Sequence, residues 1–308
     1  MLLSFVVPTL NEKPSLEKLY QLIVENVVKI GHDYEIIFVD DGSSDGSGEL
    51  LAELHQKDSR VKVLEFRRNF GKAAALMAGF AQAEGEVVFT MDADLQDDPV
   101  EIPRFLEKLD EGYDLVSGWK YPRLDPISKT APSKLANATI RFGTGIKLHD
   151  FNCGFKAMRR DVAKEIKLYG ELHRYVPVLA HWRGFSVTEI KVKHHPRQFG
   201  KSKYGMRRLF RGLFDFITVV FLIRFTRRPL HFFGMLGLIP MVVGFLIDAY
   251  LAILWFSGEQ IGHRPLLTLG TLLLMIGFQF FSIGLLAEMF SYSVLSAEDE
   301  YGIRKKLV

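Results

Sequence analysis

The sequence predicts an α/β fold, with a mostly parallel sheet covered by helices on both faces, followed by two membrane-spanning helices. Strand-like apolar runs alternate with helix-like segments through residues 1–115, and short links join them. This alternation is typical of a parallel sheet packed between helices. Residues 230–256 and 266–290 are apolar stretches, and each exceeds the about 20 residues needed to cross a bilayer. The link between them, residues 257–265, is too short for a domain, so we expect a helical hairpin.

The expected elements follow one another in a regular order. The first strand is a continuous apolar run, as expected of a strand buried on both faces. Strands are predicted at residues 2–7, 35–39, 61–66, 87–91 and 114–117, and the helices between them end near residues 30, 56, 83 and 110.

A polar cluster follows each of the first four predicted strands. These clusters are Asn11 with Glu12, Asp40 with Asp41, residues 67–72, and Asp92 with Asp94. Ligands of such sheets bind beyond the carboxyl ends of the strands. We therefore expect one site built from all four clusters.

Asp92, Asp94 and Gln96 are the candidate metal ligands. The two carboxylates stand where the fourth strand breaks into a loop, so both can reach one hard cation, with the Gln96 oxygen as a third donor. Mg²⁺ or Mn²⁺ held this way takes its remaining ligands from water and substrate phosphates. A solvated acidic loop is the alternative interpretation of the same residues.

Composition and charge narrow the class of protein. Of 308 residues 48% are hydrophobic, and the formal net charge is +3. Residues 191–228 carry eleven Lys or Arg against one acid, Asp215. Because this basic stretch adjoins the apolar spans, anionic lipid and phosphate are favoured as partners over nucleic acid.

The single cysteine, Cys153, excludes an internal disulfide and is interpreted as a packed thiol. No glycine-rich dinucleotide or P-loop pattern follows a strand, and no secretory signal is expected.

Four regions are predicted along the chain. A cytosolic catalytic domain occupies residues 1–205, an interfacial amphipathic helix region 206–228, two transmembrane helices 229–292, and a cytosolic tail 293–308. Basic residues flank the hairpin at 224–228 and 304–306, which places both flanks in the cytoplasm. The amphipathic segment could instead pack on the soluble domain. Asp248 within the first span is expected either to pair with a partner subunit or to sit at the far interface.

These residues resemble a known family. The segments that carry the resemblance are 6–12 (VVPTLNE), 39–45 (VDDGSSD), 69–72 (NFGK), 91–99 (MDADLQDDP), 149–160 (HDFNCGFKAMRR), 171–177 (ELHRYVP) and 195–205 (HPRQFGKSKYG). They resemble the family 2 glycosyltransferases with a GT-A fold, and more narrowly the dolichyl-phosphate mannose synthase and bactoprenol glucosyltransferase branch. The resemblance covers essentially the whole chain.

The resemblance implies a role for each matching residue. Pro8, Glu12 and Asp41 would line the nucleotide base and ribose pocket, with Asp40 close by, and Asp92, Asp94 and Gln96 would bind the metal and diphosphate. Independently of the resemblance, Lys72 could touch a phosphate of the nucleotide or only cap its helix. Arg197 and Lys203 would close over the phosphates, and Lys120, Lys129, Ser133 and Arg197 would meet the lipid phosphate. Some relatives have arginine at positions 120 and 129, and lysine lacks the bidentate fork; two exposed loop lysines are the alternative. Asp94, Asp150 and Arg197 would act in catalysis, Asp150 either as a base or in holding the loop or the sugar.

The implied reaction moves a hexose from a nucleotide-diphosphate sugar, of the UDP-glucose or GDP-mannose type, to a polyprenyl phosphate such as undecaprenyl or dolichyl phosphate. A single in-line attack would invert the anomeric carbon. A processive polysaccharide synthase and a non-catalytic membrane scaffold are the alternatives. The synthase would normally need more spans and a Gln-x-x-Arg-Trp motif, which the sequence lacks. The resemblance leaves the oligomeric state open between a monomer and a homo-oligomer such as a tetramer.

Overall fold

The computed structural model describes residues 1–121, 137–138, 140–141, 144–196, 221, 225, 228–262 and 265–294. The chain divides into two compact units, Met1–Val219 and Val220–Val308. The first contains the α/β fold and the second contains the apolar hairpin.

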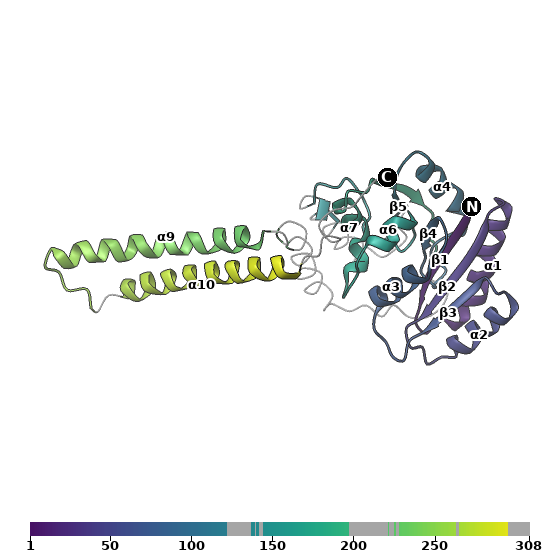
Figure 1. The fold of residues 1–308 in the computed structure, drawn as a ribbon, viewed down its shortest axis with the longest axis horizontal. Coiled ribbons are helices and arrows are strands. Elements are labelled where there is room, and N and C mark those ends of the chain that lie inside the picture. The colour runs from purple at the N-terminus through teal and green to yellow at the C-terminus, as the bar shows by residue number, and fades with distance from the viewer. Residues whose placement is uncertain are drawn as a thin grey trace. The chain divides into compact units, whose positions relative to one another are not determined.

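The α/β unit is built on a seven-stranded sheet with the order β3-β2-β1-β4-β6-β5-β7. Strands β1 to β5 are labelled in Figure 1. Its only antiparallel pairings among the named strands are those of β6 with β4 and with β5. The strands are β1 (Leu2–Thr9), β2 (Asp33–Asp40), β3 (Val61–Glu65), β4 (Val87–Thr90), β5 (Leu115–Lys120), β6 (Lys156–Arg159) and β7 (Val187–Val192). The prediction of a mostly parallel sheet is confirmed.

The strand order reverses direction at β1. The chain runs from β1 outward through β2 to β3, then returns to place β4 on the other side of β1. The connections after β1 and β4 therefore leave in opposite directions, which opens a crevice at the carboxyl ends of these two strands. This topological switch point is where a ligand site is expected.

Helices cover both faces of the sheet. α1, α2 and α4 share one buried cluster with the sheet side chains Leu3, Phe5 and Phe38. α3 lies on the other face, where a Cβ added at Gly79 would meet Val6 at 2.3 Å, so only glycine allows this approach. The helices are α1 (Lys13–Lys29), α2 (Ser47–Lys57), α3 (Lys72–Gln82), α4 (Ile102–Asp110), α6 (Arg160–Glu165) and α7 (Val176–Trp182), with short 3₁₀ turns η1 (Pro99–Glu101) and η2 (Leu172–Tyr175).

Two strands were not predicted. β6 is only four residues long and carries the charged Lys156 among buried neighbours, so it lacks the apolar run that marks the other central strands. β7 alternates in burial and contains Thr188, Glu189 and Lys191, which gives a weak hydrophobic signal. The predicted interfacial helix region, 206–228, lies outside the described residues except at 221, 225 and 228.

The second unit contains the two predicted apolar helices, α9 (Pro229–Phe256) and α10 (Pro265–Val294). Both are long and apolar enough to cross a membrane, and large apolar side chains such as Met235, Phe245 and Phe278 are more than 60% exposed along them. A soluble core helix would bury such side chains, so the exposure favours a lipid environment.

Glycines bring the backbones of α9 and α10 together at two places. A Cβ added at Gly237 would lie 2.6 Å from the Gly277 carbonyl oxygen, and one at Gly244 would lie 2.6 Å from the Gly270 carbonyl oxygen. Small residues at helix contacts allow this approach in membranes. At one end of the hairpin Glu288 accepts a hydrogen bond of 3.1 Å from the Leu230 backbone N–H, which satisfies a donor at the start of α9.

Asp58 joins α2 to the sheet through a polar cluster away from the switch point. Its carboxylate accepts hydrogen bonds from the hydroxyls of Tyr34, at 2.8 Å, and Tyr20, at 3.0 Å, and from Arg60 Nε at 2.8 Å. Burial raises the pKa of Asp58, but the bonds from Arg60 and the tyrosines outweigh it and hold the pKa below its usual range. Ionised Asp58 therefore stabilises the folded state.

Replacing Asp58 by alanine is expected to destabilise the α/β unit by about 2–3 kcal/mol, because the buried Tyr34 hydroxyl loses its acceptor. Since the folded pKa is depressed, this stabilisation is present above the unfolded pKa of about 3.9 and is lost as the pH falls below it. Chemical unfolding at pH 7 and at pH 3 measures the effect. If the free energy of unfolding differed between wild type and Asp58→Ala by the same amount at both pH values, ionised Asp58 would not be the stabilising form.

Gly244→Ala is expected to loosen the hairpin, because its new Cβ would meet backbone atoms that cannot move alone. Overpacking of this kind costs about 1–3 kcal/mol. Gly234→Ala is the matched control in α9, since its Cβ would meet no atom of the described residues nearer than 3.9 Å. Thermal unfolding in detergent should show a lower midpoint for Gly244→Ala alone; equal midpoints would refute the close packing.

Candidate active site

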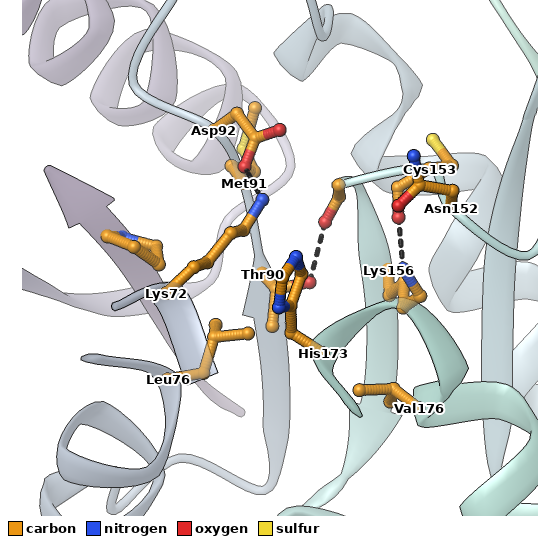
Figure 2. Close-up of a pocket in the computed structure, with 12 residues that line it drawn as sticks. Lys72, Leu76, Thr90, Met91, Asp92, Asn152, Cys153, Lys156, His173 and Val176 are labelled. Atoms are coloured by element: carbon orange, nitrogen blue, oxygen red, sulfur yellow. Dashed lines mark hydrogen bonds and ion pairs between the residues drawn. The ribbon is translucent and has the colours of Figure 1, made fainter. Parts of the chain in front are cut away.

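A pocket opens at the switch point, beyond the ends of β1 and β4 (Figure 2). The empty space in and at the mouth of the pocket, open solvent included, is about 350 Å³. Its lining joins residues from distant parts of the chain: Pro8, Lys72, Leu76, Thr90, Met91, Asp92, Asn152, Cys153, Gly154, Lys156, His173 and Val176. Of the predicted site residues, Pro8, Lys72 and Asp92 are in this lining.

Lys72 and Asp92 face each other across the pocket. Lys72 is the first residue of α3 and Asp92 follows β4, and the lysine ammonium forms an ion pair with Asp92 Oδ1 (Figure 2). Burial raises the pKa of the Asp92 carboxyl, but Lys72 and more distant lysines outweigh it, so the pKa lies below its usual range. Asp92 is therefore ionised at neutral pH.

Asp41 positions the start of α3. Its carboxylate accepts hydrogen bonds from the backbone N–H of Phe70, at 2.6 Å, and of Gly71, at 2.9 Å. Gly71 has φ of +94°, which favours glycine, so the chain can turn here directly into Lys72. Asp41 is buried, and these bonds fix the loop that carries Lys72.

Asp40 likewise accepts the backbone N–H of Ser43, at 3.0 Å, within its own loop. Glu12 is half-buried at the start of α1. Asp40, Asp41 and Glu12 are outside the lining of the pocket in Figure 2, and their assignment to the nucleotide stays a prediction.

The loop after β4 is strained and tied to a distant segment. Leu95 has φ of +59°, a conformation that costs about 1–3 kcal/mol for a residue other than glycine. Asp94 is buried and accepts the Gln96 N–H at 3.2 Å. The Gln96 carbonyl accepts the His195 N–H at 2.9 Å, and Asp97 forms a β-bridge with His194. The loop after β4, residues 91–98, thus contacts His194 and His195, which come shortly before Arg197 in the chain. Arg197 itself lies outside the described residues.

Asp97 and Lys120 are a second pair of charges at this site. Asp97 is 3% exposed, and neither of its carboxylate oxygens has a hydrogen-bond partner among the described residues. Burial, with the nearby carboxylates Asp92 and Asp94, raises the pKa of Asp97 to about 6, against the opposing charge of Lys120. Burial lowers the pKa of Lys120, but Asp97 and the other acids outweigh this and raise it. The interpretation of Lys120 as an exposed loop lysine is wrong: it ends β5 and is half-buried beside these acids.

The residues present fit a hard divalent cation. Asp92 faces the pocket, Asp94 follows two residues later, and the buried, unbonded Asp97 oxygens show an excess of acceptors in the same loop. Within the described ranges, no group of three or more His, Cys, Asp or Glu side chains is arranged to hold a metal. Such a site would depend on water and substrate oxygens for its remaining ligands, as magnesium sites at phosphates do.

The segment before β6 forms one wall of the pocket. Asp150 is 3% exposed and accepts the Asn152 N–H at 3.1 Å, which fixes the turn that presents Asn152 and Cys153. Burial raises the pKa of the Cys153 thiol to about 12, so the thiol is neutral and the prediction of a packed cysteine is supported. Lys156 follows on β6, 4% exposed, and donates a hydrogen bond to the Cys153 carbonyl.

His173 enters the pocket from η2 (Figure 2). Burial, helped by the positive charges of Lys72 and Arg174, lowers the pKa of the imidazole to about 3. His173 is therefore neutral at physiological pH, with one nitrogen able to donate and the other able to accept a hydrogen bond.

The structure brings part of the predicted site together. Asp92, Asp94, Gln96, Lys72 and Lys120 converge at the carboxyl end of β4, as shown by their contacts and charge interactions. Lys129, Ser133, Arg197 and Lys203 lie outside the described residues. Asp97, Lys156 and His173 were not predicted. All three lie inside motifs that carry the family resemblance, and that position was the only signal the sequence offered for them.

Comparison with known proteins gives a consistent result. The sequence profile described as "Glycosyl transferase family 2" matches residues 4–167. The chain is 40% identical to dodecaprenyl-phosphate galacturonate synthase of Rhizobium johnstonii, over 93% of this chain and 87% of that protein. It is 34% identical to undecaprenyl-phosphate 4-deoxy-4-formamido-L-arabinose transferase of Pseudomonas aeruginosa, over 99% of this chain and 90% of that protein.

Solved structures show the same fold. Glucosyl-3-phosphoglycerate synthase from Mycobacterium tuberculosis, bound to phosphoglyceric acid, superposes with a TM-score of 0.54 at 20% identity, covering 71% of this chain and 78% of that one. A complex of that enzyme with Mn²⁺, UDP and glucosyl-3-phosphoglycerate gives a TM-score of 0.54 at 19% identity, with the same coverage. The fold is thus that of the GT-A enzymes, and the chain belongs to glycosyl transferase family 2 and is a glycosyltransferase.

Proposed function

We propose that this glycosyltransferase moves a hexose-type sugar from a nucleotide diphosphate to a polyprenyl phosphate at the inner surface of the cytoplasmic membrane. The observation that carries the proposal is the coexistence, in one chain, of an acidic and basic pocket at the switch point with an apolar hairpin of two helices. The relatives named above act on dodecaprenyl and undecaprenyl phosphates and match nearly the whole chain, hairpin included. A soluble sugar acceptor would not require the hairpin.

The proposed orientation puts the catalytic unit and both flanks of the hairpin on the cytosolic side. Basic residues precede α9 at Arg224, Arg227 and Arg228, and follow α10 at Arg304, Lys305 and Lys306. Positive residues beside spans are retained on the cytoplasmic side.

Departure of the nucleoside diphosphate is the step that builds negative charge. Asp92 and Asp94 would hold Mg²⁺ or Mn²⁺, which supplies Lewis-acid stabilisation of the leaving group when bound. The solved relative with Mn²⁺ and UDP supports a divalent metal of this kind. Lys72 lies against Asp92 and adds fixed positive charge at the same place.

The acceptor needs little activation. A phosphate monoester has its second pKa near ~6 and is largely dianionic at neutral pH. Asp150 accepts the Asn152 N–H in a buried turn, which supports a role in holding this wall rather than in removing a proton. In-line attack by the phosphate oxygen would invert the anomeric carbon.

The product distinguishes the candidate functions. Purified enzyme is incubated with labelled sugar nucleotides, polyprenyl phosphate and Mg²⁺ or Mn²⁺. A charged glycolipid in the organic extract is expected. Insoluble polymer would identify a processive synthase instead, and the absence of turnover with every donor would contradict the proposal. The relatives transfer both a uronate and a formamido sugar, so neutral and acidic donors both belong in the screen.

Asp94→Ala is expected to reduce transfer by about 10²–10³-fold or more, because the diphosphate loses its metal-mediated stabilisation. Insertion into the membrane and thermal stability should stay near wild type. Asp110→Ala is the matched control, since it removes an exposed carboxylate at the end of α4. Chelation should abolish wild-type turnover, and added Mg²⁺ or Mn²⁺ should restore it; full activity in chelator or in Asp94→Ala would overturn the metal assignment.

A further inference from the structure

Lys156 is a buried cation that faces the pocket without a carboxylate partner in the described part of the chain. It is 4% exposed, and its ammonium donates to the Cys153 carbonyl (Figure 2). Burying an ammonium without a counter-ion costs several kcal/mol. Burial lowers the pKa of Lys156 and Lys72 adds to this, while Cys153, Asp150 and Asp92 oppose it without outweighing the burial. Burial thus disfavours the ammonium form of Lys156, and a bound anion would stabilise it.

The other polar groups of the pocket do not supply the missing counter-ion. Asp92, the one carboxylate in the lining, is paired with Lys72. His173 is neutral, and its Nδ1 is buried without a hydrogen-bond partner among the residues that the structure describes. The lining thus offers one uncompensated cation and one neutral hydrogen-bonding ring.

A singly charged carboxylate matches this set of groups. It would neutralise Lys156, and a neighbouring sugar hydroxyl or the carboxylate itself could bond to the His173 imidazole. The proposed function already assigns the diphosphate to the metal at Asp92 and Asp94 and to Lys72, which leaves Lys156, on β6, for another anionic group of the donor. The pocket lies at the switch point, where the transferred sugar of a bound donor is expected.

We propose that Lys156 binds a carboxylate on the transferred sugar, so that the donor is a nucleotide-activated uronic acid, with His173 as a second contact to that sugar. This inference rests on the proposed function and narrows it to one donor class. Lys156 acts here in specificity, since a carboxylate at C6 lies away from the anomeric carbon where bonds change.

Paired donors test the inference. UDP-galacturonate and UDP-glucuronate are compared with UDP-galactose and UDP-glucose, and GDP-mannuronate with GDP-mannose, each pair differing only in oxidation at C6. Wild type is expected to prefer a uronate in kcat/KM. Lys156→Gln should lower the ratio of uronate to neutral kcat/KM by about 10- to 100-fold, because a charged hydrogen bond is lost. The loss should appear mainly in KM.

Two variants separate recognition from folding. Lys156→Arg keeps the charge and should retain a preference for the uronate. Lys108→Gln removes a half-exposed lysine of α4 that pairs with Glu111 outside the pocket lining, and should leave the ratio at its wild-type value. If Lys156→Gln fails to fold, the ratio of uronate to neutral kcat/KM is still measured in wild type and in Lys156→Arg. A ratio below one in wild type would overturn the inference.

The outcomes distinguish this inference from the proposed function. Transfer of neutral hexoses but of no uronate to polyprenyl phosphate would overturn the inference and leave the function intact. Equal losses for both donors in Lys156→Gln would show that the lysine meets a phosphate common to them, which also overturns it. No transfer from any donor would contradict the proposed function itself.

Discussion

The arrangement of this enzyme depends on keeping several charges buried at the carboxyl end of one short strand. Asp92, Asp94 and Asp97 lie within the seven residues that follow β4, and Lys72, Lys120 and Lys156 approach them from three other elements. Charges in a poorly solvated site are costly unless they compensate one another. The fold meets this requirement for Lys72 on α3 and Lys120 on β5, which face these acids, whereas Lys156 on β6 has no carboxylate partner among the described residues. Fold and site are therefore specified by the same contacts.

Much of the fold was predictable because it depends on local pattern. Continuous apolar runs identified β1, β2 and β4, and the polar residues that end them located the switch point. The two apolar helices were evident from the length and apolar composition of their segments. β6 could not be predicted in this way, because its place between β4 and β5 results from long-range antiparallel pairing and its sequence contains a buried lysine.

The site was predictable in outline and less so in detail. Asp92, Asp94 and Lys72 could be predicted as site residues because they follow the ends of predicted strands. The ion pair between Lys72 and Asp92 could not be predicted, because a helix and a strand separate the two residues in the sequence. Asp41, predicted beside the nucleotide, uses its carboxylate to hold the backbone of the neighbouring loop. His173 depends on tertiary contacts alone, since η2 carries no sequence signal that directs a side chain toward β4.

The paired glycines of the hairpin determine how its two helices wind. The close contacts recur seven residues apart on each helix, at Gly237 and Gly244 on one and at Gly277 and Gly270 on the other. A seven-residue interval is slightly shorter than two turns of a straight α-helix, so contacts repeated at this interval favour a left-handed winding of the pair. Each helix would then keep one seam turned to its partner, and its opposite side, where Met235, Phe245 and Phe278 are exposed, would be available to acyl chains.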